Sequence, residues 1–224
     1  MSLYDQLSTE TLLARQAFAG IPIVAQALAG TVSREQYLAF LGQAYHHVRH
    51  TVPLLMACGA RLPERLGWLR TQVAEYIAEE IGHEEWILDD IAAAGGDPEA
   101  VRTTAPLPET ELMVAYAYDL IARGNPVGLF GMVFVLEGQS VALATRAAEA
   151  IRRHLGLPKA AFRYLTSHGS LDQEHIQVLE GLLERLDAPD DQAEVRRSAA
   201  MFFRLYGDIF RALSTPSEPV RSAA

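Results

Sequence analysis

Three side chains that can bind a metal ion recur at helical spacing in the last third of the chain. His168, Asp172 and His175 form the pattern H-x3-D-x2-H. At about 100° per residue, these positions fall within a narrow arc on one face of a helix. Apolar residues continue beside this face, so the triad is expected to border the core, where an unpaired polar group costs about 1–3 kcal/mol. The pattern favours metal ligation over an incidental polar face.

A second segment pairs a carboxylate with an imidazole. Glu80 and His83 form an E-x2-H pair, adjacent on one face of a predicted helix. This spacing is typical of di-iron carboxylate bundles, although an acidic helix also produces it by chance. Glu79, four residues before His83, has equally suitable geometry and is an alternative ligand.

Glu137 is the only charged residue in the stretch 124–145. An ionised carboxylate in so apolar a helix is strongly disfavoured unless a proton, a base or a metal neutralises it. A hydrogen bond between helices or a pairing with one arginine is the structural alternative. We interpret Glu137 as a metal ligand.

Together these segments supply three imidazoles and three carboxylates. The six candidate ligands are Glu80, His83, Glu137, His168, Asp172 and His175. Such a set suits two first-row metals with open positions for O2. Zinc would usually bring cysteines or a closed tetrahedral set, and Ca²⁺ and Mg²⁺ prefer oxygen ligands alone. We predict two iron ions, with manganese as the second choice.

Other polar and aromatic residues are candidates for the surrounding pocket. His46 and His50 share a helix face at i,i+4, with no acidic partner nearby, so they are expected to line the pocket or support the ligands. A cluster on the protein surface is the alternative. Tyr45 and Tyr76 are candidates for the same role, and packing in the core is the alternative. Cys58 is expected to be a small buried hydrophobe, and a nucleophile is its alternative role.

Helical periodicity and cap signals extend along almost the whole chain. We predict helices over residues 9–29, 33–60, 64–94, 109–123, 127–156, 159–186 and 190–213. No segment alternates with period two, so strands are not expected. The sequence predicts one all-α domain over 1–213, a bundle of about seven helices, followed by a disordered tail over 214–224.

Composition excludes several classes of partner. The formal charge of −9 over 224 residues argues against nucleic acid and against anionic membrane surfaces. The single cysteine favours a reducing, cytoplasmic setting, and the first residues lack the pattern of a signal peptide. The uncharged stretch 124–136 is too short to span a membrane. A small-molecule substrate is therefore expected.

The six candidate ligands, in their order and spacing, resemble the pattern of the heme-oxygenase-like di-iron oxidase and oxygenase superfamily. The resemblance implies a heme-oxygenase-like bundle, a weakly held di-iron site, O2 as co-substrate, an external electron donor and frequent homodimers. Members oxidise fatty acids, amino acids or amines. Some place the first carboxylate seven residues before the histidine, where this chain has Tyr76, so Glu79 and Glu80 both stay open.

Other readings of the same fold remain. Metal-free thiaminase-type and quinone-cofactor-forming enzymes share the architecture, and Cys58 would be the nucleophile of the thiaminase type. Heme-degrading relatives use a histidine in their first helix, whereas residues 1–45 contain none. A helical interaction protein whose ligands have become structural is the non-enzymatic alternative.

Overall fold

The computed structural model describes residues 1–214, apart from the side chains of residues 170–174. Within these residues every regular element is a helix, which confirms the all-α class. The α-helices are α1 (Leu3–Glu10), α2 (Leu12–Ala19), α3 (Pro22–Ala29), α4 (Arg34–Val48), α5 (Thr51–Arg61), α6 (Gly67–Glu80), α7 (His83–Ala93), α8 (Pro98–Thr103), α9 (Pro108–Arg123), α10 (Leu129–Leu155), α11 (Arg163–Glu184) and α12 (Pro189–Ser214). Short 3-10 segments lie at Glu64–Leu66, Pro126–Gly128 and Lys159–Phe162.

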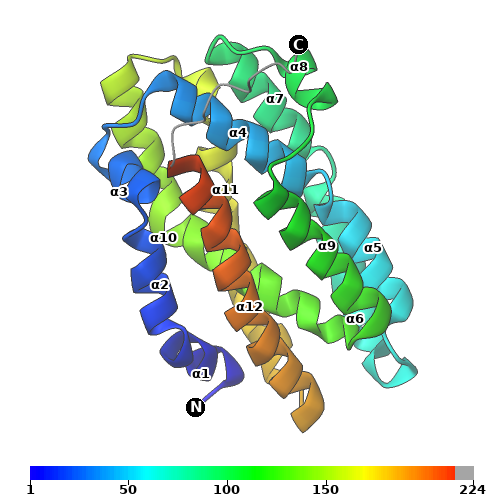
Figure 1. Ribbon diagram of the computed structural model, residues 1–224. Helices are drawn as coiled ribbons and strands as arrows, with labels where there is room; N and C mark the ends of the chain where they lie inside the picture. Colours follow the sequence, from blue (N-terminus) through cyan, green and yellow to red (C-terminus); the bar gives the residue numbers. More distant parts are fainter. Residues whose placement is uncertain (215–224) are drawn as a thin grey trace, which may run out of the picture.

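The long helix α10 runs through the middle of the bundle and packs against two other long helices, α11 and α12 (Figure 1). The short helices α1, α2 and α3 cover one side, and α5, α6 and α9 cover the other. Helix α4 crosses near one end and packs against α7. This arrangement encloses α10 and α11, which carry most of the predicted ligands.

Several predicted helices are broken into shorter ones. The segment predicted as one helix over 9–29 covers the end of α1 and all of α2 and α3, and α3 is a separate helix because Pro22 occupies its first position. The segment 33–60 forms α4 and α5, since Pro53 has no N–H with which to continue the ladder from α4. Helix α8 was not predicted; Asp97 caps it by accepting from the N–H groups of Glu99 and Ala100.

Other predicted boundaries hold. Ser33 caps α4, and Gln36 completes the capping box by accepting from the Ser33 N–H at 2.8 Å. At the other end of the chain, Ser214 still belongs to α12 rather than to the predicted tail, and its hydroxyl oxygen accepts from the Ile23 N–H at 3.2 Å. The remainder of that tail lies outside the described residues.

The most consequential break separates α6 from α7. Residues 64–94 were predicted to form one long helix, but the chain leaves helical geometry at Ile81 and Gly82. Gly82 has φ of +90°, a conformation that favours glycine. Glu80 therefore ends one helix and His83 begins the next, so the expectation that they share a helix face was wrong.

The buried apolar side chains form two clusters, and two helices, α10 and α11, contribute buried residues to both. Helix α10 contributes Val135 to the first cluster and Ala144 to the second. Helix α11 likewise contributes Leu165 to the second and Leu179 to the first. Glu137, His168 and His175 lie between these positions. The candidate ligands therefore occupy the polar layer between two apolar cores.

Close contacts fix the position of α10. At Gly131 an added Cβ would come within 2.6 Å of backbone atoms of Val195 and Ala199 on α12, so only glycine permits this approach. Near the site, a Cβ on Gly169 of α11 would come within 3.5 Å of three atoms of Thr145 on α10. These two glycines let α10 contact both neighbouring helices closely.

By length and composition, the segment Pro126–Leu155 could cross a membrane. Its most apolar 18-residue window has a mean hydropathy of 1.7. In the bundle 61% of that window is buried, a combination that core helices of soluble proteins also show. Helices α2 and α3 pass the same test only as a pair bent by 68°. The prediction from the shorter stretch 124–136 did not anticipate the first segment, because it treated Glu137 as an interruption.

Candidate metal centre

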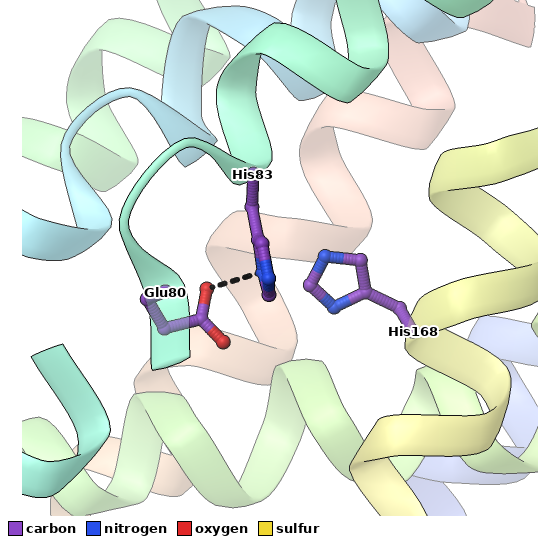
Figure 2. Close-up of side chains that lie close together, drawn as sticks. All are labelled: Glu80, His83 and His168. Carbon is purple, nitrogen blue, oxygen red and sulfur yellow. Dashed lines mark hydrogen bonds and ion pairs between the residues drawn. The ribbon is translucent and has the colours of Figure 1, made fainter. Parts of the chain in front are cut away.

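Glu80, His83 and His168 converge from three helices on one point. The Glu80 carboxylate lies 3.1 Å from Nδ1 of His83, and both side chains are buried. The rings of His83 and His168 lie nearly perpendicular, with centroids 4.9 Å apart. Figure 2 shows the His83 ring between the Glu80 carboxylate and the His168 ring. The break at Gly82 produces this arrangement, because it lets the end of α6 and the start of α7 face α11.

The donor atoms of this trio are close enough for one metal ion. One nitrogen or oxygen from each residue lies within 4.8 Å of the others. Ligand atoms stand about 2.0–2.2 Å from a first-row metal such as zinc, so two ligands of one ion are at most about 4.4 Å apart. Side-chain shifts of a few tenths of an ångström satisfy this limit. The donor set of two imidazoles and one carboxylate suits iron, manganese or zinc.

A second group surrounds His175 on α11. Its Nδ1 lies 3.5 Å from an oxygen of Glu137, and its Nε2 lies 3.0 Å from an oxygen of Glu79. Glu137 and His175 are buried, whereas the Glu79 side chain is 59% exposed. His175 is therefore held between an inner carboxylate on α10 and an outer carboxylate on α6.

Glu137 connects the two groups. It lines a cavity of about 100 Å³, here named the site cavity, together with His47, Tyr76, Glu80, Ser140 and His168. It also lines a second cavity of about 90 Å³, the His175 cavity, with Glu79 and His175. A buried carboxylate between two groups of imidazoles can neutralise charge in either one. The isolated charge in the sequence thus lies at the centre of the constellation.

The structure describes five of the six predicted ligands and brings them into these two neighbouring groups. The sixth, Asp172, lies within α11, but its side chain is outside the described residues. The alternatives Glu79 and Glu80 separate: Glu80 contacts His83 and Glu79 contacts His175. They had been interpreted as rivals for one position.

Among the predicted pocket residues, Tyr76 lies at the site. It lines both cavities, and its ring packs edge-on against His175 at 4.9 Å. Tyr45 and His46 instead pack against each other on the far part of α4, with ring centroids 5.6 Å apart. His50 Nδ1 lies 3.1 Å from the Tyr118 hydroxyl. None of these three lines the site cavity or the His175 cavity. Their other predicted role, support of the ligands, stays a prediction.

Of the three neighbouring histidines His46, His47 and His50, His47 is the one that lines the site cavity. It is buried, lines the site cavity and packs edge-on against Tyr206 on α12 at 5.9 Å. Burial, followed by the neighbouring His168, lowers the pKa of His47 to about 3, so its imidazole is neutral at physiological pH. The i,i+4 spacing drew attention to His46 and His50, whereas the position between them faces the bundle interior.

Asp90 on α7 positions the start of α11, a role that the sequence did not suggest. Its two carboxylate oxygens accept from the backbone N–H groups of Arg163 at 2.9 Å and Tyr164 at 2.8 Å. These are N–H groups of the first turn of α11, which have no partner within their own helix. Asp90 thereby joins the helix that carries His83 to the helix that carries His168.

Replacing Asp90 with Asn is expected to change how stability depends on pH. Burial raises the pKa of Asp90 to about 6. The hydrogen bonds from the Tyr164 and Arg163 N–H groups oppose this shift. Among nearby charges, Asp89 raises the pKa further and the Arg163 guanidinium lowers it. In the unfolded chain the pKa is about 3.9. Between these values the folded protein binds more protons than the unfolded chain, so wild-type stability rises as pH falls from 7 towards 4.

Urea unfolding of the metal-free protein at pH 5, 6 and 7 tests this expectation. Wild type should gain stability relative to Asp90→Asn as pH decreases, by at most about 1.4 kcal/mol per pH unit for one proton. Histidines elsewhere titrate in both proteins, so the difference between them isolates Asp90. If the free energy of unfolding changed with pH equally in wild type and Asp90→Asn, Asp90 would not titrate in this range.

Cys58 is not arranged as a nucleophile. It is fully buried, and its thiol donates to the Pro126 carbonyl at 3.3 Å. Burial raises the pKa of the thiol to about 12, so the reactive thiolate is disfavoured. Cys58 lines neither the site cavity nor the His175 cavity. The prediction that Cys58 is a small buried side chain is confirmed.

Comparison with protein families identifies the family of this chain. The model of the iron-containing redox enzyme family matches residues 38–207, a range that includes every candidate ligand. This chain belongs to the iron-containing redox enzyme family. Membership indicates an oxidoreductase that uses iron, and it confirms the resemblance first drawn from the ligand pattern. No functionally curated protein matches the chain.

Solved structures show the same fold at low sequence identity. A domain of unknown function with a heme oxygenase-like fold from Shewanella denitrificans OS217 has a TM-score of 0.87 at 24% identity, covering 94% of this chain and 91% of that one. A TenA homologue from Pseudomonas syringae pv. tomato DC3000 has a TM-score of 0.77 at 12% identity, covering 94% and 91%. Heme oxygenase from Leptospira interrogans has a TM-score of 0.75 at 16% identity, covering 95% and 100%. The fold is therefore heme oxygenase-like.

Proposed function

We propose that this protein is a non-heme di-iron oxidase or oxygenase that activates O2 to oxidise a small organic substrate. One observation carries the proposal: two neighbouring groups of buried imidazoles and carboxylates share Glu137 along their common border. Family membership supplies iron as the metal. Heme-degrading relatives place their axial histidine in the first helix, and in this chain α1 to α3 contain no histidine.

Each residue has a distinct part in the proposed site. Glu80, His83 and His168 would hold the first iron, and Glu137 and His175 would hold the second. Asp172 is proposed for the second iron by its place in the family pattern. Glu137, which borders both groups, would offer its carboxylate oxygens to the metal site from between them. The bound iron pair would supply electrons to O2 and so provide the oxidising power that the side chains lack.

Glu79 is proposed to orient His175 rather than to bind iron. His175 has two ring nitrogens, and each lies near one carboxylate. If Nδ1 faces the iron beside the buried Glu137, Nε2 donates its proton to the exposed Glu79. Metal-bound histidines commonly donate their other N–H to a carboxylate in this way, which fixes the tautomer and raises ligand basicity. Glu80 is then the ligand of the pair.

The surroundings favour oxidation of a bound molecule over loss of reactive species to water. The site cavity is walled by apolar residues of α5 and α10, including Leu54, Leu55 and Met132. Exclusion of water strengthens electrostatic interactions and prevents side reactions. We also place the reaction in the cytoplasm, because the one cysteine of the chain is a free thiol.

Anaerobic iron loading followed by exposure to O2 tests the proposed function. Wild type should bind about two Fe(II) ions per chain, measured by metal analysis, and consume O2 with a transient visible absorbance in stopped flow. His168→Ala should lose the first iron and the absorbance, while His154→Ala, on the exposed end of α10, should behave as wild type.

Absence of iron uptake by a folded wild type would overturn the di-iron proposal. A metal-free thiaminase-type enzyme or a helical interaction protein would then become the leading reading. Uptake of one heme per chain, with a Soret band, would overturn it in favour of heme chemistry. Equal iron content in wild type and His168→Ala would overturn the assignment of His168.

A further inference from the structure

An apolar cavity lies directly beside the candidate metal centre. This cavity, named here the apolar cavity, measures about 100 Å³, several times the roughly 10–15 Å³ that one water molecule requires. Side chains of α2, α3, α4, α10, α11 and α12 enclose it, on the side of the bundle where α3 packs against α10 (Figure 1). Phe18, Val24, Phe40, Leu143 and Ile151 are typical of its walls.

The apolar cavity meets the site cavity at four residues. Ser140, Tyr164, His168 and Tyr206 line both. His168 is a proposed iron ligand, and Ser140 follows Glu137 by three residues on α10, which places the two on neighbouring turns. A molecule in the apolar cavity would therefore end next to the iron ligands.

Two buried polar atoms, one at this junction and one in the wall of the site cavity, lack a hydrogen-bond partner among the described residues. They are Nδ1 of His47 and Oγ of Ser140. His47 is only 4% exposed, and leaving a buried polar atom unpaired costs about 1–3 kcal/mol. A ligand that hydrogen-bonds both atoms would remove this cost. The unpaired atoms thus indicate where the polar group of a ligand lies.

Charge restricts the nature of that polar group. Among the lining residues of the two cavities there is no Arg or Lys. The carboxylates that border them, Glu80 and Glu137, would repel an anionic head group in the metal-free protein. An ammonium group would pair with these carboxylates only in competition with iron. An uncharged hydrogen-bonding group fits the junction best.

We propose that the substrate is an elongated, mainly apolar molecule with one uncharged hydrogen-bonding end group, such as an alcohol or an amide. Its apolar body occupies the apolar cavity, and its polar end contacts Ser140 and His47 beside the proposed iron site. The cavity lining on α10 extends from Gln139 to Ile151, about 18 Å at a rise of about 1.5 Å per residue. The role of this molecule as a substrate rests on the proposed oxidase function; its binding does not.

Binding to the metal-free protein tests this proposal by isothermal titration calorimetry. The probes are 1-hexanol, 1-octanol and 1-decanol, with octanamide and octanoate for the head group. Affinity should rise about four-fold per added CH2, as burial of about 0.8 kcal/mol each predicts. Octanamide should bind like 1-octanol, and octanoate at least ten-fold more weakly at pH 7.5.

Substitutions within the cavity and outside it provide matched controls. Ala147→Phe fills the apolar cavity and should weaken 1-octanol binding at least ten-fold, whereas Ala142→Phe, exposed on the same helix, should not. Ser140→Ala should weaken binding about five-fold, the loss of one hydrogen bond. If circular dichroism shows that Ala147→Phe is unfolded, Ala27→Leu on α3 reduces the cavity from the opposite wall.

The outcomes separate the two proposals. Octanoate binding as tightly as 1-octanol, or no effect of filling the cavity, would overturn the proposed substrate class. A protein that takes up two irons but binds no alkanol would lose the substrate proposal and keep the oxidase. A protein that binds alkanols but takes up no iron would lose the oxidase proposal and keep the proposed ligand class.

Discussion

Replacement of Glu137 with Gln should reduce iron binding from about two ions to about one per chain and abolish the reaction with O2. The amide keeps the shape of the side chain and its hydrogen-bonding capacity towards His175, 3.5 Å away. It lacks the negative charge that would offset the iron ions. Because loss of a partner that merely orients a ligand costs 10–100-fold in metal affinity, loss of a direct ligand should cost at least about 100-fold.

The stability of the metal-free variant distinguishes a ligand from a structural group. Glu137 is buried in an otherwise uncharged stretch of α10, where an ionised carboxylate is costly. Glu137→Gln should therefore be at least as stable as wild type to urea before iron is added. Glu149→Gln, exposed on the same helix, should leave both stability and iron content unchanged. Marked destabilisation together with full iron loading would show that Glu137 serves structure rather than metal binding.

Neighbouring carboxylates at the end of α6 should differ in their effect on iron. Glu80→Gln removes a proposed ligand that lies 3.1 Å from His83, and the first iron should be lost, with affinity at least about 100-fold weaker. Glu79→Gln removes only the acceptor for the outer nitrogen of His175, and affinity for the second iron should fall about ten-fold. Titration with Fe(II) under anaerobic conditions measures both.

A control on the same helix completes this comparison. Glu75 is exposed and hydrogen-bonded to Gln72 at 2.8 Å, so Glu75→Gln should bind iron as wild type does. A larger loss in Glu79→Gln than in Glu80→Gln would reverse the proposed roles of the two residues. Since both variants are conservative and lie at a helix end, neither is expected to unfold the protein.

The local pattern of the chain was sufficient for the fold class and for the choice of chemistry. Periodicity identified nearly all helical residues, because an apolar stripe at helical spacing reports directly on burial. Glu137 was recognisable without a structure, since a single charge in an apolar stretch needs a partner wherever the helix packs. His168 and His175 were likewise predictable, as they lie on one helix.

Helix breaks were harder to predict, because they depend on single residues that a periodic pattern passes over. Gly82 barely disturbs the apolar spacing of residues 64–94. Its left-handed backbone conformation nevertheless separates α6 from α7. Pro53, in the first turn of α5, similarly separates α4 from α5 where the apolar pattern alone would continue one helix.

Tertiary structure alone decided which residues meet. The assignment of Glu80 to His83 and of Glu79 to His175 depends on how α6 and α11 are rotated, and adjacent positions in one helix differ by about 100°. The rotation of α4 in the bundle likewise placed His47, rather than His46, at the site. The support from Asp90 and the apolar cavity arise between helices distant in sequence. By itself, the sequence determined the helical class and the types of ligand, since these depend on local spacing. Which ligand side chains contact each other depends on how the helices pack, and only the folded bundle defines that.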